Sequence, residues 1–347
     1  MEQIVPFGCF MKAIERIIKQ AQQRPMRIAL SETEDARVLG AARRVTDMGV
    51  AQVTLVGDLL QTQAAAQKYN VSLQGINLVC PHTSVDRNEF AEHWYSLRKH
   101  KGLNYEQALL EVLDPLTFAN LMVKFGRCDG TVNGAEHATS QVVRRALQII
   151  GPAPDCELVS SFFIMMLCEP FHHLKGGLIF SDCGLVIEPN FKELAAIAIS
   201  AASSARELLM VEPKLAMLSF STNGSAKHES VDKVRYAAEL VKKACPQIAV
   251  DQDIQLDAAI VEEIAARKLP KSEVKGQSNV LIFPNLESGN IGYKLAERLG
   301  GAVAIGPLLQ GLRYPANDLS RGCSFQDIVH VIAVTVVQAQ HIHIQMS

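Results

Sequence analysis

Hydrophobic residues recur along the first part of the chain with the spacings of helices and strands in alternation. Ile14, Ile17, Ile18 and Ala21 stand at i, i+3, i+4 and i+7, which predicts an amphipathic helix over residues 11–23. Short apolar or β-branched runs then alternate with longer amphipathic stretches, which predicts strands at 27–30, 53–56 and 76–79 and helices near 34–48, 59–69 and 87–99. Such alternation is typical of parallel β-α units.

The second half repeats this pattern. The predicted strands are 215–221, 248–251, 279–284 and 302–306, and the predicted helices lie near 191–209, 228–245, 256–268 and 290–299. Ligands of open parallel sheets bind beyond the carboxyl ends of strands, so the turns after these strands are the first places to search for a site. Residues 151–154, Gly-Pro-Ala-Pro, form the best candidate linker between two domains.

The last segment carries two opposing signals. From Ile328 to Val337, eight of ten residues are β-branched, which favours a strand. Ser324 and Asp327, just before this run, have the spacing of a helix capping box. We expect a deeply buried helix. Polar residues such as His330 and Gln338 interrupt the uncharged run, so no membrane-spanning segment is predicted.

Composition and charge narrow the class of protein. The 347 residues are 48% hydrophobic and 20% charged, as in folded globular proteins. The net charge of -2 gives no positive field to hold a polyanion, so neither nucleic acid nor a membrane surface is expected as a partner. The first ten residues hold no Lys or Arg, unlike a secretory signal, and a cytoplasmic protein is expected.

Several common catalytic signatures do not occur in the sequence. The eight cysteines include no Cys-x-x-Cys pair and are expected to be reduced and mostly buried, and the pair His341 and His343 has no evident third ligand, so no metal is expected. The P-loop and the dinucleotide-binding glycine pattern do not occur, and neither do the Gly-x-Ser-x-Gly and His-Glu-x-x-His hydrolase motifs.

Three turns combine Gly, Ser and Asn with a cation. Residues 220–227 and 287–294 could cradle an anion at a helix N-terminus, or could simply be turn and capping residues. In the third turn, 317–324, Ser320 and Arg321 precede a helix start, and Asp327 at position N3 could cap that helix or act in catalysis.

Arginines provide further candidates. Arg98 ends a predicted helix, where a cation complements the helix dipole. Arg144 and Arg145 lie near a helix start, which suits anion binding better than dipole pairing.

These stretches resemble the phosphate acetyltransferase (phosphotransacetylase) family. The matching blocks run in order from about residue 11 to residue 340: SETEDARVLGAA, DGTVNGAEHATSQVVRRALQIIG, AMLSFSTNGSAKH, NVLIFPNLESGNIGYK, GPLLQGL and NDLSRGCSFQDIV. The resemblance implies two three-layer α/β domains of the isocitrate/isopropylmalate dehydrogenase-like fold, with an active-site cleft. Residues 1–154 and 308–347 would form the first, discontinuous domain, and 155–307 the second.

The resemblance also implies an activity, the reversible transfer of an acetyl group between coenzyme A and inorganic phosphate. Coenzyme A and acetyl-CoA would be substrates, with no tightly bound cofactor and no metal, and the enzyme would be a cytoplasmic homodimer of acetate metabolism. Asp327 would deprotonate the thiol, and Ser320 and Arg321 would bind and polarise acetyl phosphate. Arg98 and Arg144 would contribute to phosphate or substrate binding. Thr139, Asn290 and Tyr293, which lie in the matching blocks, complete the expected substrate-binding set.

We expect direct attack by the thiolate in a ternary complex, without a covalent enzyme intermediate. The alternatives are a phosphate butyryltransferase-like enzyme for longer acyl chains, a non-catalytic regulatory module like that of some malic enzymes, and a dehydrogenase of the related fold. Two positions depart from the family pattern. Ser31 stands where Pro is common, and Asp251-Gln252-Asp253 replaces Asp-Gly-Glu, where Gln252 tolerates a positive φ poorly.

Overall fold

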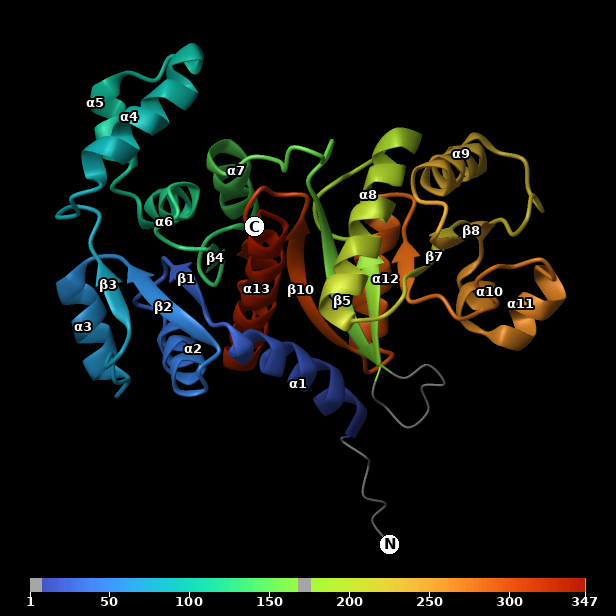
Figure 1. Ribbon diagram of the computed structural model, residues 1–347, viewed down its shortest axis with the longest axis horizontal. Helices are drawn as coiled ribbons and strands as arrows, with labels where there is room; N and C mark the ends of the chain where they lie inside the picture. Colours follow the sequence, from blue (N-terminus) through green and yellow to red (C-terminus); the bar gives the residue numbers. More distant parts are fainter. Residues whose placement is uncertain (1–7, 168–175, 347) are drawn as a thin grey trace, which may run out of the picture. The chain divides into compact units, whose positions relative to one another are not determined.

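The computed structural model describes residues 8–167 and 176–346 of the chain, which divides into two units. Unit 1 comprises Met1–Glu15 and Asp155–Gly311, and unit 2 comprises Arg16–Pro154 and Leu312–Ser347. Each unit contains its own β-sheet, flanked by helices (Figure 1). The expected two-domain α/β fold is confirmed.

Unit 2 is built on a parallel sheet of five strands, in the order β11-β4-β1-β2-β3. The strands are β1 (Met26–Leu30), β2 (Ala51–Val56), β3 (Asn77–Val79), β4 (Gly130–Asn133) and β11 (Ala316–Asp318). The first three match the strands predicted from hydrophobic periodicity. Strands β4 and β11 were not predicted, because their short Gly- and Asn-containing runs have little β-branched character.

The helices of unit 2 begin with α1 (Gly8–Gln23), whose residues from Arg16 onward belong to this unit. The others are α2 (Ala36–Asp47), α3 (Leu59–Lys68), α4 (Arg87–Arg98), the 3₁₀ turn η1 (Lys99–Lys101), α5 (Tyr105–Glu111), α6 (Pro115–Lys124), α7 (Thr139–Ile149) and α13 (Phe325–Met346). The side chains of Asp35, Asp58 and Asp114 cap α2, α3 and α6. Helices α2 and α13 pack on one another and on the sheet, and α6 packs on β1 and β4.

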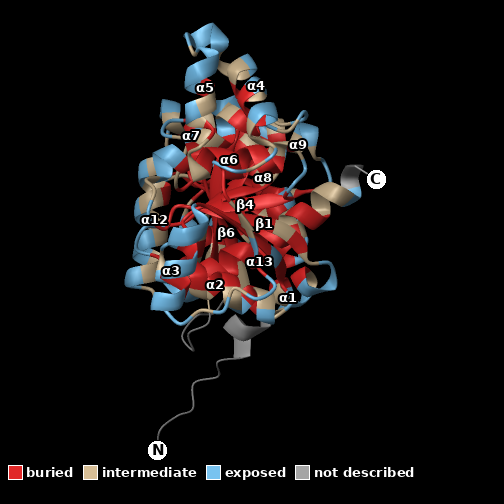
Figure 2. Cartoon of the chain, turned by 90° about the vertical axis from the view of Figure 1, so that its left-hand side faces the viewer, coloured by how far each residue is buried: buried red, intermediate tan, exposed pale blue. Residues whose placement is uncertain are grey.

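Helix α13 resolves the conflict between strand and helix signals in favour of the helix. Every residue from Ile328 to Val337 is buried, against α2, β1 and β4 among others (Figure 2). The helix is long and apolar enough to cross a membrane, but 67% of that stretch is buried inside the protein, as in the core helix of a folded domain. Burial of β-branched side chains on all sides therefore outweighs their strand propensity.

Unit 1 contains a mixed sheet of six strands, in the order β10-β5-β6-β9-β7-β8. The strands are β5 (Ser160–Leu167), β6 (Gly176–Ser181), β7 (Lys214–Leu218), β8 (Ala249–Ile254), β9 (Val280–Ile282) and β10 (Val303–Gln310). Strand β5 runs antiparallel to both β10 and β6, whereas the other pairs are parallel. The prediction of parallel units alone is therefore wrong for this half, where β5 and β6 were missed.

The helices of unit 1 are α8 (Phe191–Ser204), the π-helical turn η2 (Ala205–Leu209), α9 (Glu229–Ala244), α10 (Leu256–Ile260), α11 (Glu262–Lys268) and α12 (Leu286–Arg298). Helix α12 spans Leu286–Arg298, so all of the presumed turn 287–294 is helical, which corrects the sequence-based prediction. A Cβ at Gly289 would overlap the carbonyl oxygen of Asp182, and one at Gly292 would lie 2.9 Å from the ring of Phe283. The glycines of this motif allow close packing of α12 on its neighbours.

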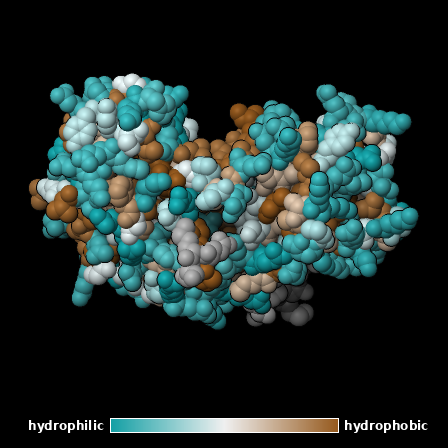
Figure 3. Space-filling model, turned by 45° about the horizontal axis from the view of Figure 1, so that its top comes forward, coloured by the Kyte–Doolittle hydropathy of each residue, from teal (hydrophilic) through white to brown (hydrophobic). Residues whose placement is uncertain are grey.

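The face shown in Figure 3 is mostly hydrophilic, and hydrophobic residues are scattered over it. Six cysteines of the described ranges are free thiols, namely Cys80, Cys128, Cys156, Cys183, Cys245 and Cys323.

Candidate active site

The loop before α13 carries three of the predicted catalytic residues. Ser320 and Arg321 are both exposed. Asp327 lies in the first turn of α13, where its Oδ2 accepts hydrogen bonds from the amide and the hydroxyl of Ser324, each at 2.8 Å. The Ser324 hydroxyl also accepts from the Asp327 amide at 3.2 Å, so the capping box predicted from the sequence is formed.

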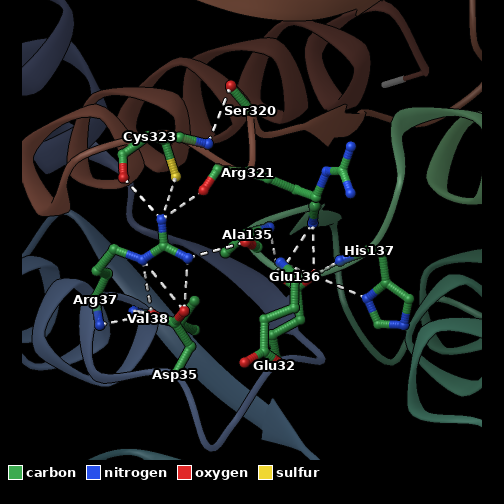
Figure 4. A network of polar contacts seen from close by, with 12 residues as sticks. Glu32, Asp35, Arg37, Val38, Ala135, Glu136, His137, Ser320, Arg321 and Cys323 are labelled. Atoms are coloured by element: carbon green, nitrogen blue, oxygen red, sulfur yellow. Dashed lines mark hydrogen bonds and ion pairs between the residues drawn. The ribbon is translucent and has the colours of Figure 1, made fainter.

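Arg37, in the first turn of α2, fastens this loop to the loop that precedes α7 (Figure 4). Its Nη1 donates to the carbonyl oxygens of Arg321 and Cys323, both at 2.9 Å. Its Nη2 donates to the carbonyl oxygen of Ala135 at 2.9 Å and pairs with Asp35 at 2.7 Å. One guanidinium group therefore sets the spacing of two loops that carry candidate residues.

Glu32, just after β1, fills the centre of the loop that precedes α7. Its carboxylate accepts hydrogen bonds from four consecutive backbone amides, those of residues 134–137, at 2.8–3.0 Å. It also contacts Nδ1 of His137 at 2.8 Å. Burial opposes its ionisation, but these hydrogen bonds outweigh burial and hold the pKa of Glu32 below its ordinary value.

Arg98 and Arg144 line one cavity of about 640 Å³ within unit 2. Arg98 is the last residue of α4. Arg144 lies in the middle of α7 and not near its start, which corrects the placement predicted from the sequence. Lys101, Arg145 and His137 also line this cavity. The structure thus gathers cationic side chains around a space that can accept an anionic group.

Trp94 supports the arginines of the cavity. Its indole Nε1 donates to Glu111 at 2.9 Å, and Glu111 also pairs with Arg145 at 3.7 Å. The guanidinium carbons of Arg98 and Arg145 lie 5.8 Å and 5.1 Å from the centre of the Trp94 ring. Cation–π contacts with one buried ring therefore position both arginines.

Thr139 begins α7 beside the buried end of β11. Burial raises the pKa of Asp318, in β11, to about 7. Gly134 lies against this end of β11 and has a φ of +113°. A Cβ at this position would lie 2.7 Å from the amide of Leu319. Only glycine fits this close approach of two strand ends.

Asn290 and Tyr293 belong to unit 1, on α12, whereas the six other candidates belong to unit 2. Asn290 Nδ2 donates to the carbonyl oxygen of Cys183 at 3.1 Å. Tyr293 stacks on Phe163 with 4.1 Å between ring centres, at the edge of the unit 1 core. Both residues therefore have structural contacts of their own in addition to any role in binding.

The turn at 220–227 holds a carboxylate of the protein itself. Asp253, at the end of β8, accepts from the Ser221 hydroxyl at 3.0 Å and from the Gly224 amide at 2.8 Å. Within the segment Asp251-Gln252-Asp253 the positive φ lies at Asp253 (+22°) and not at Gln252. The structural reading of this turn is favoured over that of an anion cradle.

The other departure from the family pattern has a local explanation. The amide and the hydroxyl of Ser31 both donate to Oδ1 of Asn133, at 2.9 and 2.6 Å. A proline has neither donor, so Ser31 adds two buried hydrogen bonds between the ends of β1 and β4.

Three site-forming residues were missed by the sequence analysis, namely Glu32, Arg37 and His137. All three lie in the quoted matching blocks, which was the only signal available. Across residues 8–167 and 176–346, no group of three or more His, Cys, Asp and Glu side chains is arranged to hold a metal ion.

Comparison with known proteins places these features in a family. The model of the phosphate acetyl/butaryl transferase family matches residues 12–336. Phosphate acetyltransferases from Paracoccus denitrificans and Clostridium acetobutylicum are each 48% identical over 330 residues, which is 95% of this chain and 100% and 99% of theirs.

Solved structures agree with this relationship. A phosphotransacetylase from Streptococcus pyogenes superposes with a TM-score of 0.89 at 39% identity, covering 95% of this chain and 98% of that one. A structure from Salmonella typhimurium described as a 4-hydroxythreonine-4-phosphate dehydrogenase, 11% identical with a TM-score of 0.53, covers 92% of this chain and 100% of its own, and shares the fold alone. This chain belongs to the phosphate acetyl/butaryl transferase family.

Proposed function

We propose that this chain is a phosphate acetyltransferase, an acyltransferase that moves an acetyl group reversibly between coenzyme A and inorganic phosphate. The cavity lined by Arg98 and Arg144 is the observation that carries the proposal, because it offers a phosphate group cationic ligands on a rigid support. Relatives bearing this enzyme name at 48% identity over nearly the whole chain support it.

The arginines act on the phosphate part of the substrate. Arg98, Arg144 and Arg321 neutralise the charge that grows on phosphate as it leaves the acyl carbon. Ser320, whose side chain is exposed beside Arg321, donates a hydrogen bond to the reacting acyl phosphate. Phosphate is a competent leaving group, so these contacts need only orient it and stabilise its charge.

Asp327 acts on the thiol of coenzyme A. A thiol with a pKa of about 8.5 is only a few per cent ionised at neutral pH, so a positioned base raises the thiolate fraction. Both hydrogen bonds from Ser324 reach Oδ2 of Asp327, which leaves Oδ1 to take the proton. The sulfur–carbon bond then forms as the bond between the acyl carbon and the phosphate oxygen breaks, and phosphate departs.

The remaining candidates bind the rest of the substrates. Thr139, Asn290 and Tyr293 are proposed to contact acetyl phosphate or coenzyme A. Coenzyme A is a substrate and not a resident cofactor.

The thiolate attacks directly in a ternary complex, so double-reciprocal plots of initial rates should give intersecting lines. Parallel lines or a trapped acetyl-enzyme would contradict this mechanism.

The setting of the enzyme is part of the proposal. We infer a cytoplasmic homodimer that serves acetate metabolism and binds neither nucleic acid nor membranes, and in which no metal takes part. Light scattering on the purified protein should give a mass near twice 37.9 kDa. A monomeric mass with full activity would remove the dimer from the proposal.

The decisive assay measures acetyl phosphate formed from acetyl-CoA and phosphate, together with thiol release from acetyl-, propionyl- and butyryl-CoA. We expect the highest kcat/KM with acetyl-CoA. A preference for butyryl-CoA would favour a phosphate butyryltransferase, and no turnover with any of the three would favour a non-catalytic module.

Asp327→Asn tests the base directly. The amide oxygen of Asn can still accept from Ser324, so the helix cap is kept while the proton acceptor is lost. Turnover should fall by about 10²- to 10⁴-fold, the range typical of general base catalysis. Near-normal activity in a folded variant would remove Asp327 from the mechanism.

A further inference from the structure

His137 joins the buried carboxylate of Glu32 to the arginine-lined cavity. Its Nδ1 lies 2.8 Å from Oε1 of Glu32 (Figure 4). His137 is also among the residues that line the cavity. The side chain of Glu32 is 2% exposed and that of His137 is 28% exposed. One nitrogen of the ring is therefore held from inside the protein, while part of the ring reaches the cavity.

The loop amides cannot serve a ligand in the same place. Four consecutive backbone amides before α7 are already bonded to Glu32. Any anion that approaches from the cavity therefore meets the imidazole and not the amides. The hydrogen bond that His137 Nδ1–H donates to Glu32 fixes the orientation of the ring and favours its protonated form.

We propose that His137, positioned by Glu32, is a ligand of the substrate phosphate through Nε2–H, alongside Arg98 and Arg144. This inference rests on the proposed function, because it assigns the phosphate group to this cavity. The charge of such a histidine ligand depends on pH, whereas the arginines stay protonated.

The charges around His137 favour the protonated ring. The hydrogen bond to Glu32 is the largest cause that raises the pKa of His137, burial lowers it, and the charges of Glu32, Asp114 and Glu136 raise it further. Asp318 acts electrostatically with His137 from β11. The cationic groups lining the cavity are Arg98, Lys101, Arg144 and Arg145, and Glu111 and Asp114 are its anionic ones.

The thermodynamic linkage between phosphate binding and protonation of His137 provides a test. If phosphate binds the protonated ring more tightly, then saturating phosphate must raise the pKa of His137 by the same factor. The measurement is an NMR titration of protein labelled at histidine, with and without inorganic phosphate, in which the His137 signal is assigned by its loss in His137→Gln. We expect the midpoint to rise by about one pH unit, equivalent to tenfold tighter phosphate binding to the protonated form. A midpoint unmoved by saturating phosphate would overturn the proposal even if the enzyme is fully active.

Kinetics provide a second readout. In His137→Gln the KM for phosphate should rise about tenfold at a pH below the NMR midpoint of the wild-type ring and much less at a pH well above that midpoint. His82→Gln is the matched control, since His82 is exposed, belongs to unit 2 and does not line the cavity. An equal rise in KM at both pH values would show a structural effect and reject the charged ligand.

Two further variants separate the neighbouring groups. Glu32→Gln should lower the NMR midpoint of His137, and an unchanged midpoint would contradict the pairing. Asp318→Asn should leave the phosphate-dependent shift of His137 in place, and loss of the shift would assign it to Asp318. An inactive wild-type enzyme whose His137 still responds to phosphate would disprove the acetyltransferase function and leave the phosphate ligand intact.

Discussion

Carboxylates of the protein occupy the backbone amides that short Gly- and Ser-rich turns offer to anions. Glu32 fills the loop before α7, Asp253 fills the turn at 221–224, and Asp182 accepts from the amides of Gly184 and Leu185 at 2.7 and 2.9 Å. Because these amides are bonded internally, they are not available to a bound phosphate. Side chains, namely the arginines, His137 and Ser320, are therefore the groups that define the candidate site.

Asp318 gives a prediction about pH and stability. Its folded pKa of about 7 lies above its ordinary value of 3.8, so the folded state keeps a proton that the unfolded state loses as pH rises from about 4 to 7. The contribution of Asp318 to the free energy of unfolding is therefore present below pH 4. It is lost as the pH rises through 7, and the loss amounts to at most about 4 kcal/mol. Relative to wild type, Asp318→Asn should become more stable between pH 4.5 and pH 8.

Urea unfolding at the two pH values measures this difference. Asp47→Asn is the control, because Asp47 is exposed and forms only a surface pair with Arg43. Its difference from wild type should stay below about 1 kcal/mol at both pH values. An Asp318→Asn effect independent of pH would contradict a carboxyl group that ionises near pH 7.

Arg37 gives a prediction about positioning. Arg37→Lys keeps the positive charge but cannot bond Arg321, Cys323 and Ala135 at once, because an ammonium group lacks the planar fork of donors. We expect kcat to fall about tenfold through misplacement of the loop that carries Ser320 and Arg321. Arg44→Lys, on the exposed side of the same helix, should leave kcat unchanged. Equal activities of the two variants would show that the loop needs no such anchor.

Much of the candidate site follows from sequence blocks, but its supporting contacts do not. Arg98, Arg144, Ser320, Arg321 and Asp327 could be named from the resemblance, and their roles remain predictions. The contacts of Glu32 with the loop before α7 join residues 102 to 105 positions apart in the chain. Periodicity reports which side of an element is buried, and carries no information about which distant loop an acidic side chain meets.

At the scale of elements, strong periodicity gave correct predictions and short apolar runs did not. Helices α1, α2 and α9 and strands β1 and β2 lie close to their predicted positions. Strand β5 was not predicted, because a continuous apolar run such as Ser160–Leu167 does not distinguish a buried strand from a buried helix. Its antiparallel pairing depends on which strands become neighbours, which is a tertiary property.

Helix α5 ends in Glu111, an acidic side chain that pairs with Arg145 at the cavity. Glu111→Gln should keep the acceptor for Trp94 Nε1 but remove the negative charge, so the cavity becomes more positive. We expect the Kd for inorganic phosphate to fall about two- to fivefold, or roughly 0.5–1 kcal/mol. Trp94, the single tryptophan of the chain, lines the cavity, so its fluorescence can report phosphate binding.

Glu106→Gln is the matched control for Glu111→Gln. Glu106 lies on the same helix, is exposed and does not line the cavity. The Glu106→Gln variant should leave the Kd for phosphate unchanged. Weaker binding in Glu111→Gln would instead show that the ion pair with Arg145 organises the cavity.

At the scale of the whole molecule, unit 2 depends on two distant parts of the chain. The segment from Leu312 to the C-terminus adds edge strand β11 to β4 and packs α13 on α2 and the sheet. A chain truncated after Gly311 would expose this apolar surface, so unit 2 should fail to fold. Trp94 emission should shift to the red, as for an indole in water.

Circular dichroism and fluorescence together check this prediction. Trp94 reports unit 2 alone, whereas circular dichroism reports both units, so the truncated chain should retain part of its helical signal from unit 1. Removal of residues 344–347 only is the control and should leave Trp94 emission as in the full chain. A buried Trp94 in the longer truncation would show that residues 16–154 fold alone.

The discontinuity of unit 2 also sets an order of events during translation. Arg98 and Arg144 leave the ribosome with the first part of the chain, but Ser320, Arg321 and the core helix follow only after all of residues 155–311. At about 5–20 residues per second, the first part waits roughly 10–40 s for its last strand and helix. During that interval the nascent chain presents the uncovered apolar faces of α2 and β4, where a ribosome-associated chaperone would find its binding site.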